Sequence, residues 1–450
     1  MANNQHAAVN LRDTSPGAWW MLAILFGLYV MSIVDRYVII MLVPSIKHSL
    51  SISDSEMGMV LGPAFSIIYA LFGIPLGWAA DRLPRRWVIF IGTILFACAT
   101  VASAKADSFV GLFIARACVA IGEASLSPAA YSLMADRFPR TLLTTASSIF
   151  NTASYVGKAA AYTIGGVVLG LLGGTHLILP LLGAFQSWQL VFLMTGVPSI
   201  LIALLVFTFR DPPRLIFGGS DSKTDGSAVS YLLVNWRLMF PMLAGLAFAS
   251  TCSSALAAWV PTYLTRHYGM SPVHFGPILG AINIVTASTL VIKGGIVDWL
   301  YARGAKDIHI RFYTWLLAAS LPVAFGMFFV KSAMTFIIMY GVVDVVALTL
   351  IFYLAATIQL IVPARLKGRI ISVFYLTLSL LGVGVGPLIV GLLTDHVFRD
   401  ELKVGWSLAA IVFTTLPLAL VSFRWSLKPI REAMARVEEA SAAVPVGSLG

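Results

Sequence analysis

The chain has 450 residues, of which 59% are hydrophobic and only 11% are charged, and its formal net charge is +10. Soluble globular proteins carry about 25% charged residues, so this composition excludes an ordinary soluble protein with a polar shell. A strongly basic balance could indicate nucleic-acid binding, but the placement of the cations argues against that class.

Twelve apolar runs recur along the chain, and many have the roughly 20 residues that a helix needs to cross a bilayer. Short polar spacers separate them and leave no room for a separate soluble domain. The first run follows a polar segment without a small-residue cleavage site, which favours a retained span over a signal peptide. The predicted spans are 18–43, 57–79, 87–104, 109–135, 143–172, 188–209, 237–263, 274–297, 312–330, 333–361, 370–394 and 405–427.

The lysines and arginines are distributed unevenly about these spans. Of the 30, 20 lie in the N-terminus, the even-to-odd loops and the C-terminus, whereas six lie in the opposite loops. The positive-inside rule therefore predicts a multi-pass protein of the cell (inner) membrane with both termini in the cytoplasm. The remaining four, Arg36, Arg116, Lys158 and Lys293, fall inside predicted spans.

Burial makes the ionisable residues inside the spans the first candidates for function. A charge at a helix centre costs on the order of 2.5–3.5 kcal/mol on insertion scales, so it needs a partner, water or a role. Lys293 lies near a cytoplasmic end and is expected to extend its ammonium to the interface. The other intramembrane candidates are Asp35, Arg36, Arg116, Glu123, Lys158 and Asp344.

Depth along the helices brings three of these residues together. Asp35 lies nine residues before Pro44 in a span that runs outward, and Arg116 lies seven residues after Phe109 in one that runs inward. At 1.5 Å per residue their depths differ by about 3 Å, so the two side chains can pair if their helices are neighbours. Glu123 lies two turns beyond Arg116, on the same helix face and about 10 Å deeper.

We therefore predict that Asp35, Glu123 and Arg116 couple proton movement to transport. All seven histidines fall in loops or near span ends, so carboxylates must carry any proton through the membrane centre. We expect Glu123 to be neutral in one state and ionised in another, while Asp35 pairs with Arg116. The alternative is a static buried ion pair that fixes the helix register.

The other intramembrane charges have several interpretations. Arg36 projects about 100° away from Asp35 around the helix, so it is expected to face another helix or the outer vestibule. Lys158 can meet an anionic headgroup, or it can satisfy Glu123 or backbone carbonyls. Asp344 stands alone in its span and is a further candidate for coupling.

The two halves of the chain differ in character. The first carries nearly all of the intramembrane charge, whereas the second offers polar and aromatic side chains. A polar wall that faces an aromatic wall suits an amphiphile with a charged head, although helix packing also explains the aromatic residues. The predicted substrate-binding residues are Arg36, Arg116, Lys158, Glu123, Asn283, Tyr353, Phe374 and Tyr375.

Echoes at about half the chain length indicate an internal duplication of six spans plus six. Asp81 and Asp298 occupy similar glycine-containing and basic loops 217 residues apart, and FPRTLLTTAS is echoed by VPARLKGRIIS. The predicted domains are a cytoplasmic tail (1–17), a six-helix bundle (18–209), a cytoplasmic linker (210–235), a second six-helix bundle (236–427) and a cytoplasmic tail (428–450).

The duplicated loops predict a latch that holds one conformation and opens in the other. Gly77 would let helices approach closely, and Asp81 would bind a neighbouring helix N-terminus or an arginine. An ordinary basic cytoplasmic loop is the alternative, especially for Arg85 and Arg86. The predicted latch residues are Gly77, Asp81, Arg82, Arg85, Arg86, Asp136, Arg137, Asp298 and Arg303.

These motifs resemble the major facilitator superfamily. Its signatures match G-x-x-x-D-R-x-x-R-R from Gly77 to Arg86, R-x-x-x-x-x-G from Arg116 to Gly122 and a fifth span rich in glycine (Gly157, Gly165, Gly166). Pro84 replaces a glycine that is usual in the loop motif. The resemblance implies an all-α membrane fold of twelve transmembrane helices in two pseudo-symmetric six-helix bundles, with the first and fourth spans lining a central cavity.

Within that superfamily the chain is similar to the spinster-like transporters. The shared features are Asp35-Arg36 with the exit Val43-Pro44-Ser45-Ile46, the stretch from Gly122 to Pro128, and the stretch from Ala135 to Pro139. The resemblance implies movement of lysolipids and sphingoid phosphates in animal members, with proton coupling in bacterial ones.

The sequence thus predicts a proton-coupled secondary transporter that works by alternating access on a lysolipid or sphingoid-type amphiphile. The alternatives are a symporter of small organic or sugar acids and a non-transporting membrane receptor or scaffold. We expect a monomer that uses the proton gradient, without a cofactor, a metal site or a nucleic-acid partner. An enzyme is disfavoured, since the chain has no G-x-x-x-x-G-K, H-E-x-x-H or G-x-S-x-G motif.

Overall fold

The computed structural model describes residues 16–172, 177–179, 183–213, 228–305, 307–348, 354, 357–358, 360–363 and 366–442. In this part the chain forms long helices joined by short turns, with one small hairpin between the seventh and eighth helices. The first-half helices are α1 (Pro16–Leu50), α2 (Asp54–Leu61), α3 (Pro63–Arg82), α4 (Arg85–Ser103), α5 (Phe109–Ala124), α6 (Leu126–Arg137), α7 (Arg140–Leu172) and α8 (Ser187–Leu204). The hairpin strands are β1 (Leu177–Leu179) and β2 (Gly183–Phe185), paired antiparallel with Ile178 opposite Ala184.

The second half is built in the same way from helices that are often interrupted by π-helical or 3-10 turns. Its helices are α9 (Ala228–Val234), α10 (Trp236–Tyr268), α11 (Pro272–Ala302), α12 (Ile308–Gly326), α13 (Ala333–Ala347), α15 (Lys367–Thr377), α16 (Val385–Leu392) and α17 (Val404–Ala442). Its π-helical segments are η4 (Leu378–Gly384) and η5 (Leu393–Phe398), and its 3-10 turns are η2 (Met327–Phe329) and η6 (Glu401–Lys403), while the first half ends with the 3-10 turn η1 (Leu205–Thr208).

The helices agree with the predicted spans. Among the described residues, ten helical segments are long and apolar enough to cross a membrane. They coincide with ten of the predicted spans, and α7 and α13 lie at the other two. The all-α membrane fold is therefore confirmed, while the count of twelve is reached only when these two helices are included.

The predicted tails and linker fall partly outside the described residues, which exclude 1–15, 214–227 and 443–450. Within the described part, α17 continues past the predicted boundary at residue 427 to Ala442. The extension is rich in alanine, glutamate and arginine, which are strong helix formers.

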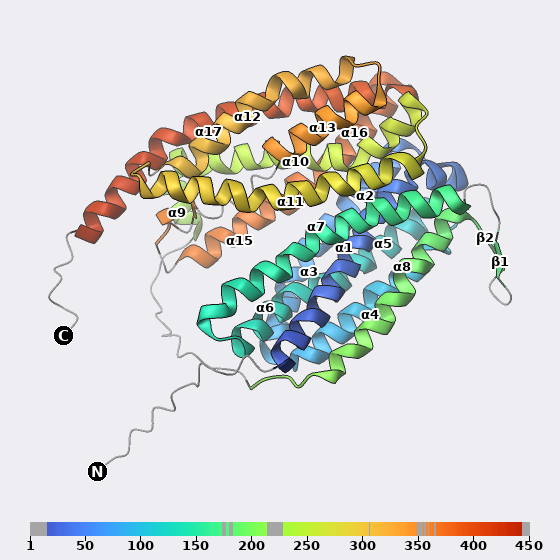
Figure 1. The fold of residues 1–450 in the computed structure, drawn as a ribbon, viewed down its shortest axis with the longest axis horizontal. Helices are drawn as coiled ribbons and strands as arrows, with labels where there is room; N and C mark the ends of the chain where they lie inside the picture. Colours follow the sequence, from blue (N-terminus) through green and yellow to red (C-terminus); the bar gives the residue numbers. More distant parts are fainter. Residues whose placement is uncertain are drawn as a thin grey trace, which may run out of the picture.

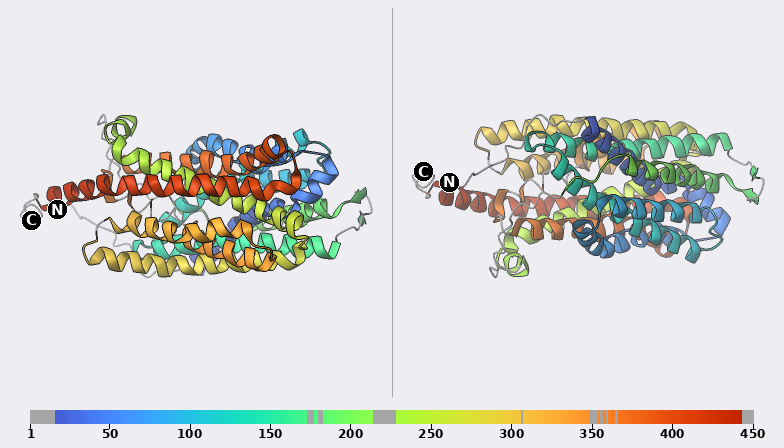
Figure 2. Two further views of the ribbon diagram at one scale, coloured as in Figure 1. Left: turned by 90° about the horizontal axis from the view of Figure 1, so that it is seen from above. Right: turned by 90° about the horizontal axis from the view of Figure 1, so that it is seen from below.

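The helices run along one long axis in two groups (Figures 1 and 2). Helices of the first half lie together in the lower part of Figure 1, and those of the second half lie in the upper part. The hairpin β1–β2 marks one end of the molecule, which we call the hairpin end. The opposite end carries the turn between α3 and α4 and the last turns of α17, and we call it the basic end.

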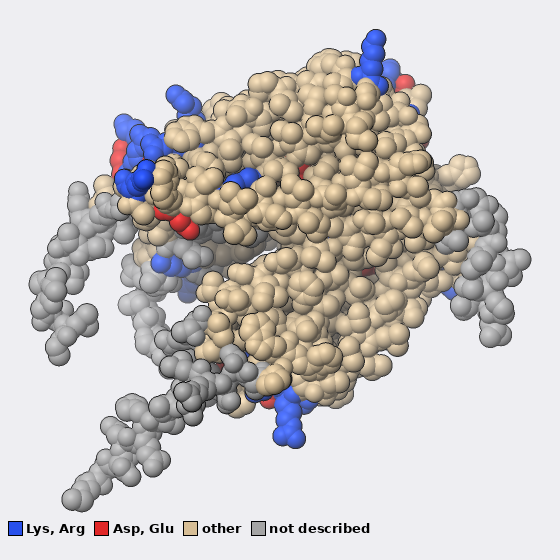
Figure 3. Space-filling view, viewed as in Figure 1, with Lys and Arg blue, Asp and Glu red and all other residues tan. Residues whose placement is uncertain are grey.

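Charged side chains gather at the two ends in Figure 3, and the broad band between them is almost entirely uncharged on this face. That band is what a surface facing lipid requires, because hydrocarbon cannot solvate charge. Many large apolar side chains of the spanning helices are exposed, among them Ile74, Ile91 and Val291.

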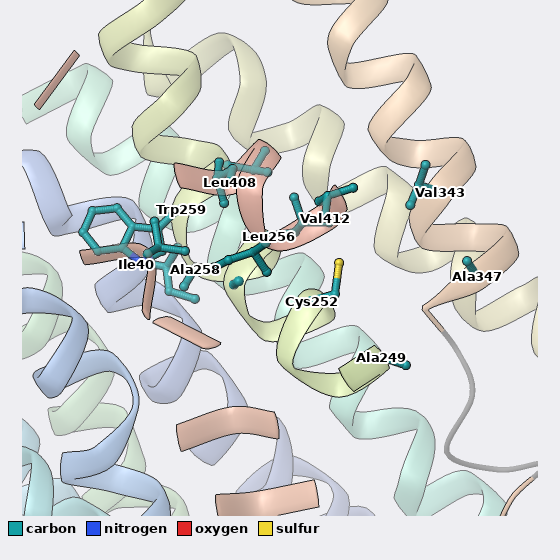
Figure 4. Close-up of a cluster of buried hydrophobic side chains, with 14 of the residues drawn as sticks. Ile40, Ala249, Cys252, Leu256, Ala258, Trp259, Val343, Ala347, Leu408 and Val412 are labelled. Carbon is teal, nitrogen blue, oxygen red and sulfur yellow. The ribbon is translucent and has the colours of Figure 1, made fainter. Parts of the chain in front are cut away.

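Buried side chains hold the helices of the second half together. Cys252, Leu256 and Trp259 of α10 pack beside Leu408 and Val412 of α17, with all five side chains buried (Figure 4). The Trp259 indole donates to the Pro387 carbonyl at 3.0 Å, which ties α10 to α16. Between the halves, α7 packs along α11 and α2 packs along α16.

Candidate functional site

Asp35 lies at the centre of a buried contact between three helices of the first half. Its Oδ2 accepts from Nη1 of Arg116 on α5 at 2.8 Å, and its Oδ1 accepts from the Thr100 hydroxyl on α4 at 2.7 Å. Nη2 of Arg116 also reaches the Asp35 carbonyl at 3.5 Å. The Asp35–Arg116 contact expected from depth is therefore present, and both oxygens of the carboxylate have partners.

Arg36 faces other helices, as expected, and there it binds Glu123 of α5, a partner that was not predicted for it. The Arg36 guanidinium donates to Oε2 of Glu123 through Nη2, and through Nε at 3.2 Å. It also lies 4.0 Å from the Phe65 ring centroid and 5.4 Å from that of Tyr69, both on α3. Helical side chains lean toward the helix N-terminus, so the long Arg36 side chain extends back to the level of Glu123.

We call Asp35, Arg36, Arg116 and Glu123 the charge quartet. The side chains of Asp35 and Glu123 are 0% exposed and that of Arg116 is 3% exposed, whereas Arg36 is 25% exposed. Two anions and two cations balance one another, which is how a protein keeps charges away from water. Within the quartet one atom remains unsatisfied, since Oε1 of Glu123 is buried without a hydrogen-bond partner in the described part of the chain.

A cavity of about 240 Å³ lies between the two halves, next to the quartet but separate from its side chains. Its lining includes Lys158 of α7, Asn283 of α11 and Asp344 of α13, so a cation and an anion from opposite halves share one space. The remaining lining residues are Tyr37, Tyr155, Tyr162, Leu246, Ala249, Ser250, Ser253, Ser254, Ala257, Tyr340, Leu348, Leu378 and Val383.

The two cavity charges are held differently. The ammonium of Lys158 lies 4.8 Å from the Tyr37 ring centroid and 5.7 Å from that of Tyr155, within the range of cation–π contacts. Asp344 Oδ2 accepts from the Thr286 hydroxyl at 2.8 Å, and Lys293 nearby donates to the Val345 carbonyl. Among the described residues Glu123 binds Arg36 and not Lys158, so the predicted Lys158–Glu123 contact is absent from this conformation. The headgroup and backbone-carbonyl interpretations of Lys158 stay predictions.

Several predicted substrate-binding residues do not face this cavity. Arg116 and Glu123 are buried in the quartet, where they pair with Asp35 and Arg36 of the same half. Phe374 is 0% exposed in the second-half core, and its neighbour Tyr375 is 53% exposed. Asn283 does line the cavity, and Tyr353 lies outside the described residues.

The hairpin end is closed by ion pairs between charged side chains of the two halves. Asp54 of α2 is 0% exposed and binds both Lys47 of α1 and Arg266 of α10, with the Arg266 contacts at 2.7 and 2.9 Å. Glu401 of η6 binds Lys47 at 2.9 Å and Arg266 at 3.0 Å. We call these four residues the hairpin-end cluster.

Backbone contacts tighten the same end. A Cβ on Gly62 would lie 2.2 Å from the Gly384 carbonyl oxygen in the other half, so only glycine permits this approach. This closure was not predicted from the sequence. Its signals are the Ser53–Glu56 capping box that starts α2 and the ionisable residues that flank the spans at this end.

The predicted latch at the basic end is open between the halves. Asp81 and Asp298 are exposed, and no hydrogen bond or ion pair is recorded for either within the described chain. Gly77 has no atom within 4 Å of an added Cβ, so the expected close approach there is wrong for this conformation. Without an opposing helix, Arg82 stacks on Trp78 at 4.6 Å and Arg303 on Trp299 at 3.6 Å.

Arg85 belongs to a cluster within the first half and is not an exposed loop residue. It is 1% exposed, binds Asp136 of α6 and lies 2.7 Å from Asp211, which follows α8. Its neighbour Arg86 donates to the Phe209 carbonyl at 2.9 Å, and Arg137 ends α6 beside Asp136. These contacts bind the basic ends of α4, α6 and α8 to one another.

The described residues contain no group of three or more His, Cys, Asp or Glu that could hold a metal ion. The site thus consists of a buried charge quartet, a cavity with opposite charges on its two walls, a closed hairpin end and an open latch. The charged and polar lining of the cavity can bind a polar group between the halves.

Known proteins share this architecture. The chain is 27% identical over 401 residues to an MFS-type efflux pump of Mycolicibacterium smegmatis, with 85% of this chain and 86% of the relative covered. It is 26% identical to protein spinster homolog 1 of Xenopus laevis, with 85% and 74% covered, and 24% identical to the hexuronate transporter of Bacillus subtilis, with 84% and 88% covered.

A crystal structure of a bacterial homolog of the human lysosomal transporter spinster, inward-facing and unoccupied, superposes with a TM-score of 0.79 at 22% identity. The alignment covers 94% of this chain and 99% of that one. The family model of the Major Facilitator Superfamily matches residues 25–387. The chain therefore belongs to the Major Facilitator Superfamily, and spinster homologs are among its relatives in sequence and structure.

Proposed function

We propose that this protein is a proton-coupled secondary transporter that moves an anionic, lysolipid-like or sphingoid-type amphiphile by alternating access. The observation that carries the proposal is the charge quartet, in which two carboxylates and two guanidinium groups balance inside the apolar part of the helices. A transporter needs such groups because a proton that binds one of them changes the pairing of all four.

Glu123 is the first proton acceptor in this scheme. Its Oε2 binds Arg36, but its buried Oε1 has no partner and can take a proton without breaking a hydrogen bond. A neutral Glu123 holds Arg36 less strongly, because the charge-assisted contact is lost. Arg36 is the most exposed member of the quartet, so it can then turn to another anion.

Asp35 is the second acceptor and is held more firmly. Both of its oxygens accept hydrogen bonds, one from Thr100 and one from Arg116. Its protonation requires Arg116 to release Oδ2 or Thr100 to change partner. The two carboxylates therefore protonate in different steps, and Arg116 exchanges partners between them as the halves move.

Alternating access uses the two ends of the molecule. The positive-inside rule assigns the basic end to the cytoplasm, with both chain termini there, in the inner membrane of the cell. In this assignment the conformation is closed to the outside by the hairpin-end cluster and open to the inside. In the opposite state the cluster separates, and Gly77, Asp81 and Asp298 meet the other half.

Lys158 is the proposed contact for the anionic headgroup. Its ammonium lies in the cavity beside two tyrosine rings and has room for a phosphate or carboxylate. Asn283 and the serines of α10 provide further polar groups, and Leu246, Leu348 and Leu378 offer apolar surface to the start of a chain. Spinster homologs among the relatives support an amphiphile.

A sugar acid is the second candidate substrate. The relatives include the hexuronate transporter of Bacillus subtilis and a D-galactonate transporter of Escherichia coli, at 24% and 26% identity. The cavity carries serine, asparagine and tyrosine groups that can bind hydroxyls, together with the cationic Lys158.

The test is a thermal-shift screen of the purified protein with lysophospholipids, sphingoid bases and hexuronates, followed by uptake and counterflow in liposomes. The proposal predicts stabilisation by a lysophospholipid, and uptake of that lipid that responds to an imposed pH gradient. If hexuronates stabilise the protein and the lipids do not, the substrate is a sugar acid and not a lysolipid-like amphiphile. Binding without counterflow would establish a receptor instead of a transporter.

A further inference from the structure

Thr100 contacts the charge quartet without carrying charge itself. It lies on α4, is 0% exposed, and places Oγ1 2.7 Å from Oδ1 of Asp35. The same hydroxyl lies 2.9 Å from the carbonyl oxygen of Phe96, one turn earlier in α4. A hydroxyl carries a single proton, so it can donate to only one of these two acceptors at a time.

We propose that Thr100 is a positioning residue for Asp35 that changes its hydrogen-bond partner each time Asp35 gains or loses a proton. The inference rests on the proposed function, in which Asp35 takes part in proton coupling. It adds a residue whose hydroxyl serves both protonation states of the carboxyl group.

The two hydrogen-bond patterns are complete for each state. With Asp35 ionised, Thr100 donates to Oδ1 and Arg116 donates to Oδ2, so both carboxylate oxygens are satisfied. When a proton binds Oδ1, one O–H bond forms there and the new group donates to Oγ1 of Thr100. The Thr100 hydroxyl then rotates and donates to the Phe96 carbonyl, and the reverse steps follow when the proton leaves.

Within the described residues, the charged groups around Asp35 come from α1 and α5. Arg116 approaches from α5 and binds Asp35 directly, while Arg36 and Glu123 lie beyond it and bind each other. Thr100 is therefore the uncharged donor to this carboxylate within the described part of the chain. A hydrogen bond to an ionised group is worth more than one between neutral groups, so Thr100 favours the ionised form.

The experiment follows the protonation of Asp35 without requiring a substrate. Infrared difference spectra of the purified full chain in liposomes are titrated with pH, and the Asp35 carboxylic-acid band is assigned by its loss in Asp35→Asn. Thr100→Val removes the hydroxyl and keeps the branched shape. We expect it to raise the midpoint pH of the Asp35 band by about one unit or more.

Two further variants keep the test decisive. Thr100→Ser retains the hydroxyl and is expected to restore the parent midpoint, whereas a purely steric role of the threonine methyl group would leave the serine variant as altered as the valine one. Thr100→Cys supplies only a weak donor and is expected to give an intermediate midpoint, and it replaces the valine variant if that protein does not fold.

Failure of this inference is separable from failure of the proposed function. If Asp35→Asn abolishes pH-driven uptake of a lysophospholipid but Thr100→Val leaves the Asp35 midpoint unchanged, only the role of Thr100 is wrong. If Asp35→Asn transports at parent rates and no carboxylic-acid band depends on Asp35, proton coupling through Asp35 itself is wrong.

Discussion

The charged side chains inside the two halves differ in their partners and in their exposure to the cavity. In the first half, Asp35, Arg36, Arg116 and Glu123 satisfy one another, and three of the four are almost completely buried. In the second half, Asp344 has a threonine partner and faces the cavity, opposite Lys158. The side chains proposed for proton coupling and those proposed for substrate contact are therefore adjacent but distinct.

The largest effect is expected from breaking the quartet at Arg116. Arg116→Ala leaves the fully buried Asp35 without its cation, and loss of one partner of a buried pair costs about 3–5 kcal/mol. We expect a large fall in thermal stability, measured on the purified protein, together with loss of transport. Arg116→Lys is the control, because one ammonium cannot make both of the contacts to Asp35.

If Arg116→Lys matches the parent in stability and transport, the two-contact geometry is unimportant. If Arg116→Ala is as stable as the parent, Asp35 is not ionised in this conformation and the balance within the quartet is wrong.

The next effect concerns the closed end. Gly62→Ala introduces a methyl group 2.2 Å from the Gly384 carbonyl oxygen, so the two halves must separate there. We expect the variant to favour the state open at the hairpin end, measured as faster modification of a single cysteine introduced beside the cluster. Gly73→Ala, in the same helix as Gly77 but outside the predicted latch, is the matched control, because no atom lies within 4 Å of a Cβ added there.

A Gly62→Ala protein whose introduced cysteine reacts no faster than in the Gly73→Ala control would contradict this assignment of the closed end.

A smaller effect is expected from Lys158 on the cavity side of the comparison. Lys158→Met removes the cation and keeps much of the side-chain volume, so binding of an anionic lysophospholipid should weaken about tenfold or more, as for loss of a charged hydrogen bond. The measurement is a binding isotherm on purified protein, with the exposed Lys331→Met as the control. Equal affinity in the two variants would remove Lys158 from the substrate site.

The smallest effect is expected at Glu401, the exposed member of the hairpin-end cluster. Its side chain is 61% exposed, so Glu401→Gln should change stability by about 0–1 kcal/mol, as exposed ion pairs do. Asp54→Asn is the comparison, because Asp54 is fully buried between Lys47 and Arg266. Similar thermal shifts in the two variants would mean that burial does not determine the strength of this cluster.

Sequence reasoning predicted the fold and part of the site for identifiable reasons. Long apolar runs have few options besides spanning helices, and depth along straight helices was enough to pair Asp35 with Arg116. The Arg36–Glu123 contact was missed, because an angular argument about Cβ directions does not follow a long side chain back toward the helix N-terminus.

Other features depend on what a linear pattern cannot express. The sequence does not show in which conformation of the protein a given glycine or aspartate makes its contact. Gly77 and Asp81 were therefore expected at a contact that is absent from this conformation. Thr100 resembles any small residue in an apolar span, and only its distance to Asp35 distinguishes it. Lys158 and Asp344 line the same cavity because the two halves pack together, with α7 along α11, and a linear pattern does not contain this contact.

The most direct test of proton coupling through the quartet compares two transport modes in liposomes that contain parent protein or Glu123→Gln. For a lysophospholipid that stabilises the purified protein, we predict that Glu123→Gln retains counterflow at zero pH gradient but loses uptake driven by a pH gradient. Parent-level pH-driven uptake in this variant would contradict the claim that Glu123 carries the coupled proton.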